Sequence, residues 1–184
     1  DQLGDNDSAF EVLGSALAHR PGDEQTRQEL EVLAGELEQW EKLAHFYGTA
    51  LETADDPEDQ RRLLLAISRI MDHRLGEAET AEAVYLRVLE MDPTDEDALE
   101  ALDRIYTQYE RWPELSEIIE RRIGLSMDED AVVQHSYRLA LLCQEQLGDL
   151  DKAVDTYNRI LDIHPTHPEA LSALESVYLS REEW

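Results

Sequence analysis

The sequence lacks several features on which secreted, membrane-spanning and catalytic proteins depend. It has one cysteine, Cys143, so it can form no intrachain disulfide, and no apolar run approaches the length of a membrane span. The eight glycines are scattered and form no phosphate-binding loop, and no Ser/His/Asp signature or nucleophile elbow occurs. No secretory signal is seen. We therefore expect a cytoplasmic chain that has no catalysis of its own and needs no cofactor.

Basic residues are also scarce. The 184 residues include 43 acidic and 16 basic side chains, a formal net charge of −27, and the only lysines are Lys42 and Lys152. Such a negative field repels nucleic-acid phosphates and anionic membrane surfaces, and it attracts a basic protein segment. The alternative is that the charge only keeps the surface solvated. The expected partner is a protein or peptide, with a basic segment as one candidate; nucleic-acid binding and membrane insertion are not expected.

What the sequence does contain is an internal repeat of 72 residues. Trp40, Trp112 and Trp184 recur at this interval, and residues 29–112 align with 101–184 without a gap. The alignment pairs Leu30 with Leu102, Leu75-Gly76 with Leu147-Gly148, Ala81 with Ala153, Tyr85 with Tyr157, Pro93 with Pro165, and Tyr106 with Tyr178. Fixed-period self-similarity is typical of a stacked array. The recurrence indicates that the tryptophans and tyrosines pack against neighbouring helices, and that Trp184 begins a further helix.

The local pattern within each repeat is helical. Apolar residues fall at steps of three and four, as in Ala98, Leu99, Leu102 and Ile105, so they line one face of a helix. Sustained two-residue alternation is missing, which argues against strands. A residue before proline avoids the helical region, which marks several helix ends. These patterns predict ten helices at about 7–19, 23–37, 40–52, 58–74, 77–91, 95–109, 112–125, 130–146, 149–163 and 167–180.

Residues 137–165 resemble a tetratricopeptide repeat (TPR), a helix–turn–helix unit of about 34 residues. The resemblance rests on Tyr137, Gly148-Asp149 at the turn, Ala153 where the helices cross, Tyr157 and the closing Pro165. Residues 62–95 match likewise, while 24–57 and 96–129 carry a tryptophan where the family has tyrosine. The resemblance implies an all-α, right-handed superhelical solenoid of about five antiparallel helix pairs. We expect one elongated array over residues 1–184, incomplete at both ends and part of a longer protein.

In the TPR family the first helices of successive pairs line a concave groove that binds a peptide or helix of a partner. The resemblance implies groove positions at Gln25, Gln28, Val32, Ala66, Ile70, His73, Arg74, Asp97, Glu100, Arg104, Gln108, His135, Arg138, Leu142, Glu145, Glu169, Ser172 and Ser176. Unlike the core positions, these differ from repeat to repeat. The Lys/Asn/Arg set with which chaperone-binding members hold a C-terminal carboxylate is missing. Arg74, Arg104 and Arg138 could form a stripe that binds a carboxylate, or could only neutralise acidic neighbours.

The other reactive residues have simpler interpretations. Cys143 lies in an apolar run, which indicates a core position, and His164 and His167 flank a helix-linking turn without further metal ligands nearby. The sequence therefore predicts a protein–protein interaction scaffold. Two alternatives stay open: a regulatory or sensory segment of a larger multidomain enzyme, and an architectural array that self-associates through exposed repeat ends.

Overall fold

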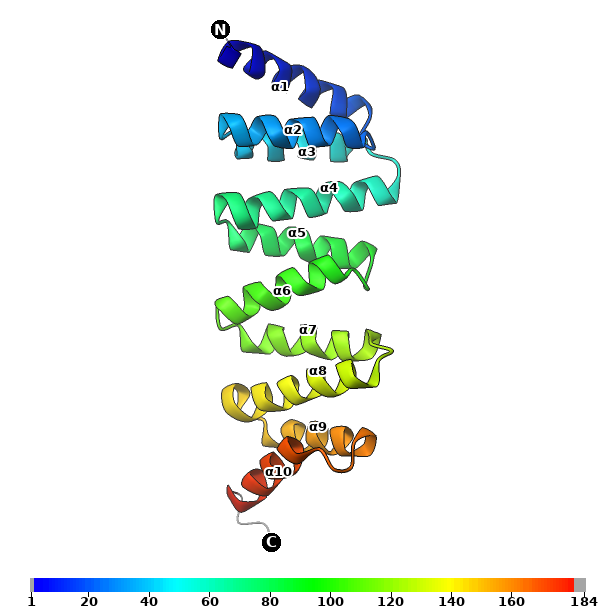
Figure 1. Ribbon diagram of the computed structural model, residues 1–184, viewed down its shortest axis with the longest axis vertical. Helices are drawn as coiled ribbons and strands as arrows, with labels where there is room; N and C mark the ends of the chain where they lie inside the picture. Colours follow the sequence, from blue (N-terminus) through cyan, green and yellow to red (C-terminus); the bar gives the residue numbers. More distant parts are fainter. Residues whose placement is uncertain (1, 181–184) are drawn as a thin grey trace. The chain divides into compact units, whose positions relative to one another are not determined.

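The computed structural model describes residues 2–180, with side chains from residue 5 onward, and every regular element in that part of the chain is helical (Figure 1). The ten α-helices are α1 (Gln2–His19), α2 (Glu24–Leu37), α3 (Trp40–Thr53), α4 (Pro57–Ile70), α5 (Ala78–Met91), α6 (Glu96–Gln108), α7 (Trp112–Leu125), α8 (Glu129–Leu142), α9 (Leu150–Ile163) and α10 (Pro168–Ser180). The predicted all-α fold of paired helices is confirmed. Helix ends agree with the predicted ones within one residue, with three exceptions: α1 begins at Gln2, and the ends predicted at 74 and 146 fall in the π-helical turns that follow α4 and α8. The predicted role of Trp184 lies outside the described residues.

Two of the helices continue into a π-helical turn. These turns are η1 (Met71–Leu75) after α4 and η2 (Cys143–Leu147) after α8. Each is followed by a glycine with positive φ, 70° at Gly76 and 67° at Gly148, a conformation that costs glycine little and other residues more. The turn η1 carries two of the predicted groove residues, His73 and Arg74.

The helices form two compact units. Unit 1 comprises residues 1–98 and unit 2 residues 99–184, and the boundary falls inside α6. Unit 1 therefore contains α1 to α5, and unit 2 contains α7 to α10. A single array that continues through both units stays a prediction of the sequence.

The core of unit 1 is built around a buried tyrosine. Its fully buried side chains include Phe10, Leu17, Leu30, Leu43, Tyr47 and Leu63. Burying an apolar side chain of this size contributes about 1.5–3 kcal/mol. The Tyr47 hydroxyl donates to the Glu31 carboxylate (3.1 Å), so the buried phenol has a polar partner. Burial and the Glu31 charge both raise the pKa of Tyr47.

The core of unit 2 also contains a buried tyrosine, Tyr157, which has a different partner. The Tyr157 hydroxyl donates to the side-chain oxygen of Gln144 (3.1 Å). Burial, with a smaller contribution from Tyr137, raises the pKa of Tyr157 to about 12. Cys143 is fully buried in the same core, and burial raises the pKa of its thiol. The prediction of a core position for this cysteine is confirmed.

Candidate functional site

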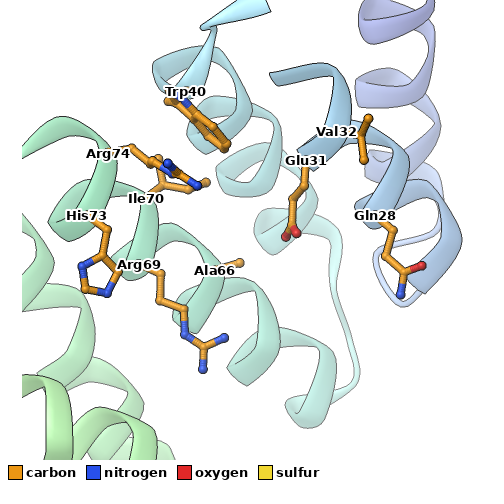
Figure 2. Close-up of a pocket in the computed structure, with 9 residues that line it drawn as sticks. All are labelled: Gln28, Glu31, Val32, Trp40, Ala66, Arg69, Ile70, His73 and Arg74. Atoms are coloured by element: carbon orange, nitrogen blue, oxygen red, sulfur yellow. The ribbon is translucent and has the colours of Figure 1, made fainter. Parts of the chain in front are cut away.

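A groove lies between α2 and α4 of unit 1 (Figure 2). It has a volume of about 560 Å³ and is lined by Gln28, Glu31, Val32, Trp40, Ala66, Arg69, Ile70, His73 and Arg74. Helix α2 supplies one wall, α4 and η1 supply the other, and Trp40 is the first residue of α3. The structure thus brings together six of the residues predicted for a groove.

The middle of the groove is apolar. Val32 on α2 is 62% exposed, an unusual degree for a valine, and Ala66 and Ile70 of α4 lie on the facing wall. Ile70 is itself buried, with only its edge available. Trp40 is partly buried and packs on the core of unit 1, as its recurrence predicted, but it also lines the groove. An apolar side chain inserted here would therefore remove further hydrocarbon from water.

The α2 wall is polar and acidic. The Glu31 carboxylate accepts the Tyr47 hydroxyl from the core side, which anchors it in place. One turn away, the Gln28 side-chain amide donates to Glu24 (3.0 Å). That bond, together with the charge of Arg27, lowers the pKa of Glu24. The wall therefore offers a fixed acceptor at Glu31.

The opposite wall carries basic side chains. Arg69 on α4 reaches Asp97, with 2.9 Å between nitrogen and oxygen, so one predicted groove residue neutralises this arginine. His73 and Arg74 follow on η1 and are exposed. The guanidinium carbon of Arg74 lies 4.4 Å from the centre of the Trp40 ring, a cation–π contact (Figure 2). The two walls of the groove therefore differ in charge.

In unit 2 an ion pair joins α6 and α8 at the position equivalent to the groove. Residues 31 and 66 correspond, 72 residues on, to Asp103 of α6 and Arg138 of α8. Arg138 donates to both oxygens of Asp103 (2.5 and 2.6 Å) and to Thr107 (3.1 Å). Asp103 is buried, and Arg122 adds a second cation 3.6 Å away. These contacts show that Arg138 neutralises an acidic neighbour, which is the second of the two roles predicted for it.

The other predicted groove residues are distributed over several surfaces. Asp97, Glu100, Arg104 and Gln108 lie exposed on α6, and Glu145 lies exposed on η2. Gln25, His135 and Leu142 do not line the groove of unit 1. Leu142 is 7% exposed, much like its counterpart Ile70, and it lines neither of the two hollows of unit 2 described next.

A second hollow lies between α8 and α10 of unit 2. It has a volume of about 440 Å³ and contains the predicted residues Glu169, Ser172 and Ser176, together with Tyr137, Leu141, Gln144, Pro168 and Ala173. A third hollow of about 480 Å³ is formed by α7, α8 and α9, with Lys152 and Glu120 paired at its rim (2.6 Å). The resemblance could not predict this third hollow, because it pointed only to first helices.

The sequence interpretation missed three residues of the unit 1 groove: Glu31, Trp40 and Arg69. Two of them, Glu31 and Arg69, lie one position from residues that were predicted. Trp40 was assigned to packing alone because it recurs. Its place at the start of α3 lets one side of the indole contact the core while the other meets Arg74.

Among the described residues, no group of three or more His, Cys, Asp or Glu side chains could hold a metal ion. His167 instead accepts the backbone N–H of Ala170 (3.3 Å), a contact at the start of α10. None of the helices in this part of the chain is both long and apolar enough to cross a membrane.

Comparisons with known proteins agree with this architecture. Residues 136–167 match the tetratricopeptide repeat family. A tetratricopeptide repeat protein from Parabacteroides merdae has a similar structure, with a TM-score of 0.52 and 17% identity over 98% of this chain and 68% of that one. YrrB, described as a TPR protein with an unusual peptide-binding site, gives 0.50 and 14% over 95% of this chain and 86% of that one. BtubC from P. vanneervenii gives 0.49 and 17% over 99% and 84%. No curated protein matches the sequence.

Proposed function

We propose that this chain, whose residues 136–167 match the tetratricopeptide repeat family, is an interaction scaffold that holds a segment of a partner protein in the groove between α2 and α4. The observation that carries the proposal is the open groove of about 560 Å³ in which six predicted residues meet. YrrB, which shares the fold, is described as having a peptide-binding site. We assign no catalytic step to the chain itself.

The physical basis of binding is a preformed surface. The groove walls are helices packed on a buried core, so a partner segment can dock without first ordering the receptor. Covering Val32 and the edge of Ile70 would supply hydrophobic free energy, at about 25 cal/mol per Å² of apolar surface. The polar side chains on the two walls would then select among segments.

The remaining predicted residues form the finer part of this proposal. Glu100, Arg104, Gln108, His135, Arg138 and Glu145, with Ser172 and Ser176 in the hollow beside α10, are proposed as further partner contacts. A cytoplasmic location and a regulatory role within a larger enzyme stay predictions of the sequence.

The test fills the groove with an arginine. A random peptide library is selected against the immobilised chain, and the affinities of enriched peptides are measured for the wild type, Ala66→Arg and Ala83→Arg. Ala66 is a groove residue, whereas Ala83 is an exposed alanine on α5 and serves as the matched control. We expect Ala66→Arg to weaken binding at least about tenfold, the equivalent of 1.4 kcal/mol, and the control to leave it unchanged. Peptides that bind both variants as well as the wild type would refute the groove as the site.

A second candidate function is self-association, favoured by an open apolar face on α10. Leu171 and Tyr178 are 47% and 40% exposed, whereas the residues 72 positions earlier, Leu99 and Tyr106, are 0% and 3% exposed. Leu179 adds to the same open surface. Light scattering over a wide concentration range would detect association, and Leu171→Asp should reduce it. A strictly monomeric chain would remove this candidate.

A further inference from the structure

One wall of the unit 1 groove carries basic side chains, although the chain as a whole is strongly acidic. In a chain of net charge −27, Arg69, His73 and Arg74 lie close together along α4 and η1 (Figure 2). The residues 72 positions later are Leu141, Glu145 and Gln146, and none of them is basic. The cluster is thus not part of the repeated packing pattern. A surface that differs from repeat to repeat is where selectivity for a partner is expected.

Arg74 is the member of this wall that is best placed to bind an anion. Its guanidinium carbon lies 4.4 Å from the centre of the Trp40 ring, and no ion pair joins it to a carboxylate among the described residues. The ring contacts one side of the guanidinium, so N–H groups that point away from the ring can donate to a ligand. A planar carboxylate accepts two such N–H groups at once. Because the stack already limits the motion of the side chain, less conformational entropy is lost on binding.

The neighbouring groups define what else the ligand must carry. The apolar middle of the groove, formed by Val32, Ala66 and Ile70, lies between the two walls. On the far wall, Glu31 is a carboxylate and would repel a second one. A bound segment therefore has one favoured orientation, with its acidic group toward α4 and η1.

We propose that the unit 1 groove selects an acidic, aliphatic segment, which places a Leu, Ile or Val side chain over Val32 and Ile70 and a carboxylate against the N–H groups of Arg74. This inference rests on the proposed function of the groove and names the chemistry of its ligand. It reverses the expectation that a basic segment is bound, because that expectation came from net charge alone. Beyond about 8 Å at physiological ionic strength, exposed charges are largely screened, so the contacts in the groove decide.

The experiment measures fluorescence anisotropy with labelled peptides of equal length. One carries Leu-Ile-Glu-Glu between Gly/Ser ends, and two others replace the glutamates with glutamine or with lysine; all three have blocked termini. A fourth ends in Leu-Ile with a free C-terminal carboxylate, so that a side-chain carboxylate and a chain terminus are distinguished. Each is titrated against the wild type, Arg74→Gln, Arg74→Lys and Ala66→Arg. Glutamine is the residue that unit 2 carries at the position equivalent to Arg74.

We expect the Leu-Ile-Glu-Glu peptide to bind the wild type about tenfold more tightly than the glutamine peptide, a typical size for charge-assisted hydrogen bonds. A preference shown only by the peptide with a free C-terminus would overturn the assignment to a side-chain carboxylate. Arg74→Gln should remove that preference while the glutamine peptide keeps its affinity, and Arg74→Lys should restore it only in part. A lysine peptide that binds most tightly, or an acidic preference that survives Arg74→Gln, would overturn the inference.

The two proposals fail in different ways. If Ala66→Arg leaves every affinity unchanged, the groove is not the binding site and both proposals fall. If Ala66→Arg weakens all peptides but Arg74→Gln leaves the acidic preference intact, the groove holds and only its assigned chemistry is wrong. Thermal unfolding of each variant, matched to the wild type, establishes that the protein is folded.

Discussion

The two units follow the same 72-residue register, but equivalent positions between their first helices differ. A groove lies there in unit 1, and an ion pair lies there in unit 2. In unit 1 Ala66 faces Glu31, and a groove lies between α2 and α4. In unit 2 Arg138 occupies the position of Ala66 and binds Asp103, the counterpart of Glu31. The comparison teaches that the helical scaffold does not by itself make a groove. A single position in each repeat, Ala66 in unit 1 and Arg138 in unit 2, changes what lies between the first helices.

A second difference concerns charge. The wall of unit 1 that carries His73 and Arg74 corresponds in unit 2 to Glu145 and Gln146. The backbone is the same in both places, a π-helical turn that ends before a glycine in the left-handed conformation. The repeat therefore preserves the geometry of the wall while its charge varies.

The largest effect is expected from removing the ion pair of unit 2. Arg138→Ala leaves Asp103 buried with only Arg122 nearby, at 3.6 Å. We expect the free energy of unfolding to fall by about 2 kcal/mol, below the usual cost for a fully buried pair because Arg138 is partly exposed. Urea unfolding followed by circular dichroism measures this.

The matched control for that variant is Arg159→Ala, an exposed arginine of the same unit, which should change stability by less than about 0.5 kcal/mol. Removing both partners, with Asp103→Ala added to Arg138→Ala, should recover part of the loss, because no buried charge is then left unpaired. Equal, small losses for Arg138→Ala and Arg159→Ala would show that the pair adds little.

Much of the fold could be predicted from the sequence, because helix ends depend on local patterns. Steps of three and four and the residues before proline placed nearly every helix end within one residue. The candidate site was harder, because it depends on contacts between helices. The register showed that Ala66 and Arg138 are equivalent, but not that Arg138 reaches Asp103 across the gap. The same limit applies to Leu142, whose helix position is that of a groove residue and whose side chain is buried.

The next effect compares the two buried tyrosines. Tyr47 donates to a carboxylate and Tyr157 to a neutral amide, each at 3.1 Å. Hydrogen bonds to charged groups are stronger, so we expect Tyr47→Phe to cost about 1.5 kcal/mol and Tyr157→Phe about 1 kcal/mol. Denaturant unfolding of the two variants side by side provides the measurement. A larger loss for Tyr157→Phe would contradict the ranking.

Alkaline pH should affect the same tyrosines. The pKa of Tyr157 rises from an ordinary 10.0 to about 12, so the folded state favours the neutral phenol. A raised folded-state pKa means that this stabilisation is complete below pH 10 and is lost as pH rises toward 12. Unfolding midpoints recorded across this range should therefore fall less steeply for Tyr157→Phe than for the wild type. Parallel curves would mean that the phenol titrates equally in the folded and unfolded chains.

The smallest stability effect is expected where unit 1 is made to resemble unit 2. Ala66→Arg places an arginine opposite Glu31, and we expect a gain of only about 0.5 kcal/mol because Glu31 is exposed. Adding Glu31→Gln should abolish the gain. A gain that persists without the carboxylate would show that the new arginine stabilises by packing alone.

The central claim is that partner segments bind in the open groove of unit 1, and a methyl NMR titration tests it most directly. A peptide enriched from the library is added to the labelled protein, and the methyl signals of Val32 and Ile70 are followed beside those of Leu171 on the open face of α10 and Ile123 in the hollow of α7 to α9. The account predicts shifts at Val32 and Ile70 that disappear in Ala66→Arg. Shifts confined to Leu171 or Ile123, with Val32 and Ile70 unmoved, would contradict it.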